Sequence, residues 1–368
     1  MVDETPSLPK KGRGAVRNDS GRYERYGRIA IDDGWERPAE VEFPDENRPV
    51  TIIGLDTSRT IISHNTSPDI PFDRSINPYK GCEHGCIYCY ARPTHAYLGL
   101  SPGLDFETRI FAKPDAALLL EKAFRQPRYR PAVISLGANT DPYQPIERQR
   151  GITRSVLEVL ERFGHPVGIV TKSALVTRDI DILARMAERR LVSVFLSITT
   201  LDRDLARSME PRAATPPRRL EALRLLSQAG IPVGVMAAPM IPALNDHELE
   251  SILEAAVEAG ARSASYVLLR LPLEIKDLFA DWLTAHQPGR AKHVLSLVRD
   301  TRGGALYRSD FGTRMRGEGP YAQLLEQRFR AAVRRYGLNR HRWDLDLSQF
   351  SVPPLADGAE AGGQLTLF

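Results

Sequence analysis

Three cysteines at a spacing typical of metal ligands stand close together in the sequence, as Cys82, Cys86 and Cys89, and the chain contains no others. Three thiolates so close together converge on one metal centre. A [4Fe–4S] cluster usually takes four cysteine ligands, so three leave one iron open to a small molecule. Gly81 and Gly85 lie within this segment. Their conformational freedom would let the loop wrap around the cluster.

The competing interpretation is a structural zinc site, in which His84 or His95 is the fourth ligand beside the three cysteines. Zinc motifs usually pair two short ligand pairs across a longer gap, and this sequence has no second pair. The spacing therefore favours the iron–sulfur cluster. Three clustered cysteines also exclude the disulfide framework that small secreted domains use.

Short β-branched segments alternate with helical segments after the cysteines, in repeats of about 30 residues, which predicts βαβ units and a parallel sheet. About six repeats are too few for a closed eight-fold barrel. We therefore predict an α/β fold, an open partial (β/α)6 barrel with an N-terminal extension and C-terminal helices. The expected strands are residues 132–136, 167–171, 192–198, 232–241 and 265–271, and the expected helices are 155–163, 179–190, 217–229 and 246–259.

We expect four parts along the chain of 368 residues. Residues 1–72 are a basic N-terminal arm and extension, 73–300 the barrel, 301–345 a basic helical extension, and 346–368 a flexible tail. The first thirty residues lack periodicity and predict a mobile arm. No segment has the length and apolar character of a membrane span or a secretory signal, so a cytoplasmic protein without membrane contact is expected.

The cysteine segment resembles the signature of the radical S-adenosylmethionine (SAM) superfamily, with Tyr88 just before the third cysteine. The resemblance covers about residues 73–300. It implies that SAM binds the open iron through its amino and carboxylate groups. One electron, from a low-potential donor such as flavodoxin or ferredoxin, would then cleave SAM. The resulting 5′-deoxyadenosyl radical would take a hydrogen atom from the substrate.

Within this superfamily the chain is similar to the branch of spore photoproduct lyase and related DNA repair photolyases. Residues 86–90, 138–145 and 208–212 carry that similarity. Ligands of such barrels bind at the carboxyl ends of the strands. The similarity therefore implies the amino group of SAM for Asn139, Thr140 and Asp141, its carboxylate and ribose for Lys172 and Ser197, its carboxylate for Arg212, and its adenine for Tyr88.

Some of these assignments have simpler alternatives. Thr140 and Asp141 precede a proline and are also typical of an ordinary turn. Arg212 also fits a surface arginine beside a helix.

The chain departs from the lyase where that enzyme holds a cysteine that returns a hydrogen atom to the product radical. Here the turn after the second main strand reads Ala138-Asn139. Tyr88 and Tyr90 match tyrosines implicated in the radical relay of the lyase, so the resemblance implies a catalytic role for both. Because the chain lacks this cysteine, the resemblance does not extend to direct reversal of a thymine dimer, and the departure points to a relative with another substrate.

The formal charge of +4 is distributed unevenly along the chain. Residues 10–28 carry a net charge of +5 and residues 301–343 a net charge of +7, so the remainder is acidic. Clustered Lys and Arg side chains neutralise phosphates, which predicts a nucleic-acid partner. The alternative is a solvated face of an Arg-rich helix.

The last residues, Gln364, Leu365, Leu367 and Phe368, follow a Pro-, Gly- and Ala-rich linker. They resemble the peptide that binds the bacterial sliding clamp. A mobile tether of this kind can present Leu367 and Phe368 to an apolar pocket. The alternative is a tail that folds back onto its own barrel.

Three functional hypotheses follow. The first is a radical SAM enzyme that acts on nucleic acid, in DNA repair or modification. The second is a radical SAM enzyme that modifies a peptide or small molecule. The third is a zinc-bound nucleic-acid adaptor without catalysis.

Overall fold

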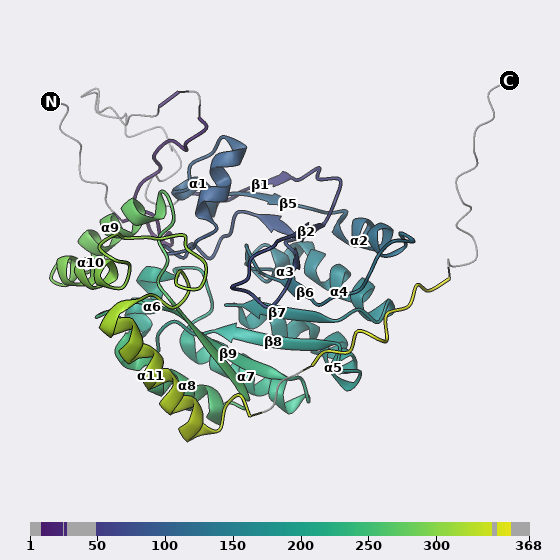
Figure 1. Cartoon of the computed structure of the whole chain (residues 1–368). Coiled ribbons are helices and arrows are strands. Elements are labelled where there is room, and N and C mark those ends of the chain that lie inside the picture. The colour runs from purple at the N-terminus through teal and green to yellow at the C-terminus, as the bar shows by residue number, and fades with distance from the viewer. Residues whose placement is uncertain (1–8, 25, 28–48, 341–343, 355–368) are drawn as a thin grey trace.

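A seven-stranded sheet forms the frame of the molecule, in the order β10-β9-β8-β7-β6-β3-β2 (Figure 1). The structure is a computed structural model that describes residues 9–24, 26–27, 49–340 and 344–354. All neighbouring strands are parallel except the β2–β3 pair, which is antiparallel. The strands are β2 (Ile62–His64), β3 (Arg74–Ile76), β6 (Ile134–Leu136), β7 (Val167–Thr171), β8 (Val192–Ser197), β9 (Val233–Met240) and β10 (Ser263–Leu268).

Helices connect the parallel strands and pack on the outer face of the sheet. The described strands do not close into a ring, because β3 and β10 lie at opposite ends of the parallel set. Six parallel strands with intervening helices confirm the predicted open partial (β/α)6 barrel. The connecting helices are α2 (Ala116–Phe124), α4 (Ile152–Arg162), α5 (Ile180–Glu188), α7 (Pro216–Gln228) and α8 (Leu249–Glu258).

The two faces of the strands differ in burial. Residues under the helices, such as Val194 and Val235, are fully buried. On the opposite face Phe195 and Met236 stay partly exposed, while Ser193 and Ser197 are buried. Phe195 packs directly on Gly234, where a larger side chain would overlap its ring.

A second, three-stranded sheet connects the N-terminal extension to the barrel. It has the order β1-β5-β4, with β1 (Ile52–Leu55), β4 (Tyr79–Lys80) and β5 (Arg109–Ala112). The cysteine segment lies between β4 and the short helix η1 (Arg92–Leu98). The remaining short helices in this part and after the strands are α1 (Leu104–Thr108), α3 (Glu147–Arg150), η2 (Ala174–Asp179), α6 (Arg203–Met209) and η3 (Asp246–Glu248).

The C-terminal region adds α9 (Ile275–His286), α10 (Ala291–Asp300) and α11 (Gly319–Tyr336), which gather on one side of the barrel (Figure 1). Residues 301–318, here called the strap, connect α10 to α11. The backbone of Met315 accepts a hydrogen bond from Leu268 in β10 at 2.9 Å. The strap also reaches the β2–β3 loop, because Arg314 pairs with Asp69. It therefore links both ends of the parallel sheet.

Within the described part of the chain, the helices are all too short or too polar to span a membrane.

Candidate active site

The three cysteines lie in one tight loop, residues 81–89, here called the cluster loop. Cys82 and Cys86 are buried and Cys89 is half-buried. Gly81 and Gly85 adopt the left-handed backbone conformation, with φ of 78° and 68°. This confirms that glycine is needed at both positions, because other residues rarely adopt that conformation.

A buried ion pair holds the cluster loop from behind. Arg92, which is fully buried, donates hydrogen bonds to the carbonyl oxygens of Cys86 at 2.9 Å and Gly85 at 3.0 Å. The same guanidinium pairs with Glu107, which is also fully buried. The carbonyl groups of Gly85 and Cys86 are thereby turned toward Arg92, which fixes the backbone of the loop between its cysteines.

Residues 9–24, here called the N-terminal segment, add to this support of the cluster loop. The backbone amides of Gly14 and Ala15 donate to the Glu107 carboxylate at 2.9 and 2.8 Å, and the Arg13 side chain donates to its carbonyl oxygen at 3.0 Å. Gly14 lies so close to Gly85 that a side chain on it would overlap the Gly85 carbonyl oxygen. The predicted mobile arm is therefore wrong for this segment, which is a buried part of the site.

Other basic residues of the N-terminal segment are also engaged within the fold. Arg17 pairs with Asp281 at 2.5 Å, and Arg22 pairs with Glu274 at 2.7 Å. These arginines attach the segment to α9 and to the loop before it. Their charge is thus partly neutralised, which the net charge of the sequence did not reveal.

The turn after β6 supports the cluster loop from the other side. The amide of Gln144 donates to the Gly81 carbonyl oxygen at 3.1 Å, and its oxygen accepts from the Glu83 backbone at 2.9 Å. The Thr140 hydroxyl donates to the Tyr79 carbonyl oxygen at 2.7 Å. Asn139 is half-buried, and its side chain has no hydrogen bond to another described residue. The Tyr143 hydroxyl of this turn is also without a hydrogen-bond partner in the described structure, but it is buried, so Asn139 has the more accessible free polar group.

Asp141 is occupied by several protein partners. It accepts hydrogen bonds from the Thr171 hydroxyl at 2.6 Å and the Lys172 backbone at 2.7 Å. His84 lies 3.3 Å away. Burial by itself would raise the pKa of Asp141, but His84 and these hydrogen bonds outweigh it and lower the pKa to about 2. Asp141 therefore ties the cluster loop to the end of β7 as a carboxylate.

Tyr88 belongs to a buried polar network at the ends of β8 and β9. Its hydroxyl donates to Glu210, which also accepts from Thr199 at 2.7 Å and pairs with Arg219. Lys172 lies over the Tyr88 ring, with its nitrogen 5.7 Å from the ring centroid. Sequence analysis assigned no role to Thr199 or Arg219, and it marked Glu210 only as part of the stretch 208–212 that carries the family similarity. Glu210 follows α6 and Arg219 lies in α7, and no local pattern indicates that they pair.

Tyr90 lies in a different environment from Tyr88. Its hydroxyl donates to the carbonyl oxygen of Ala138, and its side chain is 47% exposed. Arg270, which follows β10, lies over its ring at 5.4 Å. Of the two predicted catalytic tyrosines, Tyr90 is the accessible one, and it contacts the turn after β6.

Ser197 and Arg212, both predicted to bind SAM, make different contacts in the structure. Ser197 is buried at the end of β8, and its carbonyl oxygen accepts from Arg219 at 2.9 Å. Arg212 pairs with Glu83 of the cluster loop at 3.0 Å. The Arg212 contact holds the loop, so its predicted role in binding SAM stays a prediction.

The cysteine side chains show how the loop would hold a metal centre. Burial raises the pKa of all three thiols, and the charge of Lys172 lowers the pKa of Cys86 and Cys89. Metal binding deprotonates cysteine, so a nearby cation suits bound thiolates. His95 contacts the Arg109 carbonyl oxygen at 2.9 Å, and burial lowers its pKa to about 4. Cysteine thiolates are the usual ligands of a [4Fe–4S] cluster. The assignment of the three cysteines to such a cluster stays a prediction.

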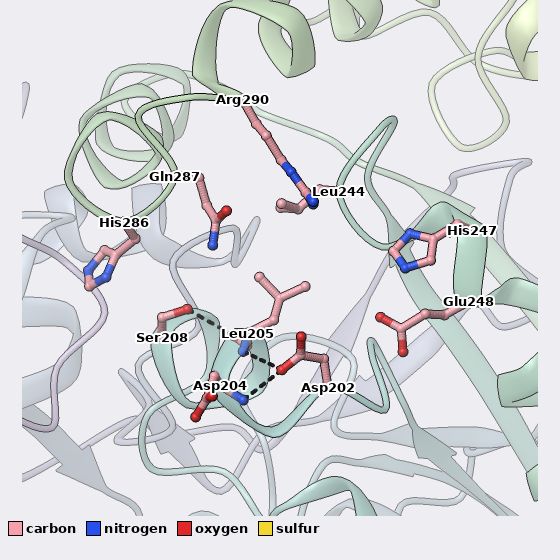
Figure 2. A pocket seen from close by; sticks show the side chains of 10 residues that line it. All are labelled: Asp202, Asp204, Leu205, Ser208, Leu244, His247, Glu248, His286, Gln287 and Arg290. Atoms are coloured by element: carbon pink, nitrogen blue, oxygen red, sulfur yellow. Dashed lines mark hydrogen bonds between the residues drawn. The ribbon is translucent and has the colours of Figure 1, made fainter.

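A pocket of about 490 Å³ lies between α6, η3 and the turn from α9 to α10 (Figure 2). Its lining includes His247, His286 and Arg290. Leu205 of α6 lines this pocket and also packs in the hydrophobic cluster that contains Cys86. Helix α6 therefore connects the pocket to the cluster loop, although the pocket is lined by none of the residues predicted from the sequence.

Comparisons with known proteins agree with this geometry. The family model of the radical SAM superfamily matches residues 76–256. An uncharacterised protein of Mycobacterium tuberculosis is 33% identical over 302 residues, which cover 81% of this chain and 83% of that protein. An uncharacterised protein of Methanocaldococcus jannaschii is 30% identical over 173 residues, which cover 47% of this chain and 62% of that protein.

Among solved structures, spore photoproduct lyase is similar with a TM-score of 0.55 and 18% identity, over 78% of this chain and 80% of the lyase. At this identity the similarity shows a shared fold. The family match and the relatives, together with the three-cysteine loop at the first strands of a partial barrel, show that the chain belongs to the radical SAM superfamily of enzymes.

Proposed function

We propose that this enzyme binds a [4Fe–4S] cluster through Cys82, Cys86 and Cys89 and acts on nucleic acid, in DNA repair or modification. The observation that carries the nucleic-acid half is the strap beside the mouth of the barrel. Its Phe311 is 60% exposed, and Arg314 lies 4.6 Å from the centroid of that ring. Arginine with an exposed aromatic ring suits phosphate contact and base stacking. A lyase of the same fold has been solved with a dinucleoside spore photoproduct.

Other basic segments support this proposal less than their sequence suggests. In α11, Arg328 pairs with Glu250 at 2.6 Å and Arg330 pairs with Glu326 at 2.5 Å.

The strap arginines are paired as well, Arg314 with Asp69 and Arg308 with Glu318. What distinguishes the strap is its exposed aromatic ring beside the barrel mouth, so we assign nucleic-acid binding to this region. Membership in an enzyme superfamily also favours the enzymatic hypotheses over the zinc adaptor.

When bound, the cluster and SAM supply a 5′-deoxyadenosyl radical that takes a hydrogen atom from the substrate. Residues of this chain would position SAM above the cluster loop. Lys172 suits its carboxylate and Asn139 its amino group, because neither side chain has a protein ion pair or hydrogen bond in the described residues. Ser197 at the end of β8 suits the ribose. Tyr88 offers the adenine a buried aromatic ring.

Tyr90 is our candidate for returning a hydrogen atom to the product radical. It is the exposed tyrosine that directly follows the cluster loop, and its hydroxyl donates to the carbonyl oxygen of Ala138. The cysteine that serves the lyase is missing from this turn. A phenol O–H can give up a hydrogen atom in its place, which leaves a tyrosyl radical on Tyr90. One electron from the low-potential donor, together with a proton, would restore the phenol.

The substrate class can be tested by following a deuterium label. We expect oligonucleotides that carry deuterium in the sugar and base positions to transfer it into 5′-deoxyadenosine, as measured by mass spectrometry. With Tyr90→Phe, transfer of deuterium into 5′-deoxyadenosine should persist. Formation of the product that has regained a hydrogen atom should fall at least about tenfold, because the O–H donor is gone.

Tyr97→Phe is the matched control, since Tyr97 is 70% exposed on η1 and outside the cluster loop. This variant should keep both the transfer of deuterium and the formation of the final product. Transfer of label from a deuterated peptide but from no DNA or RNA would refute the nucleic-acid proposal.

We also propose that the C-terminal peptide binds a sliding clamp. Gln364, Leu365, Leu367 and Phe368 lie outside the described residues, so this proposal rests on their resemblance to clamp-binding peptides. Replacing Leu367 and Phe368 by alanine should abolish clamp binding in surface plasmon resonance, because both apolar anchors are lost. Thr366→Ala is the control. Equal binding of the double variant and the wild type would show that the tail has another role.

A further inference from the structure

Two cations at the barrel mouth each lie over one tyrosine ring, Tyr88 in the cluster loop or Tyr90 directly after it. Lys172, which follows β7, lies over Tyr88, and Arg270, which follows β10, lies over Tyr90. Both side chains are half-buried. Neither has an ion pair with any residue in the described ranges. Partly buried charges usually have an opposite charge nearby, so both positions are suited to an anion that comes with a ligand.

Arg270 is incompletely satisfied by the protein. One terminal nitrogen donates to the Met315 sulfur at 3.3 Å, and sulfur is a weak acceptor. Its Nε is buried and has no hydrogen-bond partner in the described structure. Asp69 is close enough for the charge of Arg270 to lower its pKa, although a hydrogen bond from the Gly312 backbone is the main cause. That carboxylate is already bound to Gly312 and Arg314.

The two cations at the barrel mouth, Lys172 and Arg270, have different expected anionic partners. SAM brings one carboxylate, and Lys172 is beside Cys86 and Cys89, where SAM would meet the cluster. Arg212, the other residue predicted for that carboxylate, pairs with Glu83. Arg270 therefore remains for a second anion, on the side of Tyr90.

We propose that Arg270 binds a phosphodiester group of the substrate and holds the adjoining nucleotide against Tyr90. This inference rests on the proposed action on nucleic acid and adds a binding residue to it. The composition of the strap is the reason to infer a phosphodiester group rather than the carboxylates of an acidic peptide. Arg270 contacts Met315 of the strap, which also carries exposed Phe311 and Arg308, the latter paired with Glu318. An aromatic ring beside arginines suits a base next to its phosphate.

The test compares wild type and Arg270→Gln as full-length, cluster-loaded proteins. The probe is a fluorescent single-stranded oligodeoxynucleotide, and its affinity is measured by anisotropy at several salt concentrations. Loss of one charge-assisted contact should weaken binding about tenfold. The slope of log affinity against log salt should fall by about 0.7. Arg270→Lys should recover part of the affinity because it keeps the charge.

Arg185→Gln is the matched control, because Arg185 is 54% exposed on α5 and pairs with Glu161. It should bind the oligonucleotide as wild type does. Equal affinity of Arg270→Gln and wild type would overturn the subsite and leave the proposed function standing. A loss of SAM affinity in place of oligonucleotide affinity would also overturn it. Binding of polyglutamate that depends on Arg270, with no oligonucleotide binding by wild type, would refute both proposals.

Discussion

Gly14→Ala is expected to deprive the enzyme of most of its cluster. The added methyl group would overlap the carbonyl oxygen of Gly85, and both groups belong to backbone segments. Neither can move without disturbing the hydrogen bonds from Gly14 and Ala15 to Glu107. The cluster loop would shift, and the three thiols would no longer meet one centre. Iron and labile sulfide, measured per chain after anaerobic reconstitution, should fall several-fold.

Gly27→Ala is the matched control, because a methyl group there would meet no atom within 4 Å. It should bind the cluster as wild type does. The circular dichroism of both variants checks that the barrel itself remains folded. If Gly14→Ala retains full iron and an unchanged spectrum of the reduced cluster, the N-terminal segment has no role in holding the loop.

Glu210→Ala is expected to lower the free energy of unfolding by about 3 to 5 kcal/mol. The variant would leave the buried Arg219 without its counter-charge. It would also remove the acceptor of the Tyr88 and Thr199 hydroxyls. Urea unfolding of the protein, followed by fluorescence, measures the change.

The double variant Glu210→Ala/Arg219→Met should be more stable than Glu210→Ala alone, since it leaves no unpaired buried charge. Arg224→Ala removes an exposed arginine from α7, the helix that also carries Arg219, and Arg224 pairs there with Glu221. We expect a change below about 0.5 kcal/mol for this control. A similar small effect for Glu210→Ala would show that the buried pair contributes little.

The barrel was predictable from sequence because its signal is local. Each strand is a short apolar segment and each helix has a 3.6-residue period, so the order of elements follows from the chain itself. The expected strand at residues 167–171 coincides with β7, and most other boundaries differ by one to three residues. The spacing of the cysteines was equally local and identified the cluster loop.

The support of the loop was not predictable, because it depends on contacts between distant parts of the chain. Gly14 and Glu107 are 93 residues apart. A short Gly- and Arg-rich segment has no periodicity that would indicate burial. For the same reason, the sequence did not show which basic side chains are paired with carboxylates. Arg17 and Arg328 looked available in the sequence, but each has a carboxylate partner from another element.

The outer side of β10 has a consequence for association between copies of the chain. A strand at the end of a sheet presents unpaired N–H and C=O groups, which can template pairing with a second molecule. Here Asn339 exchanges two hydrogen bonds of 2.9 Å with the backbone of Ala264, and Met315 occupies the amide of Leu268. The strap and the end of α11 thus also protect an open barrel against edge-to-edge aggregation.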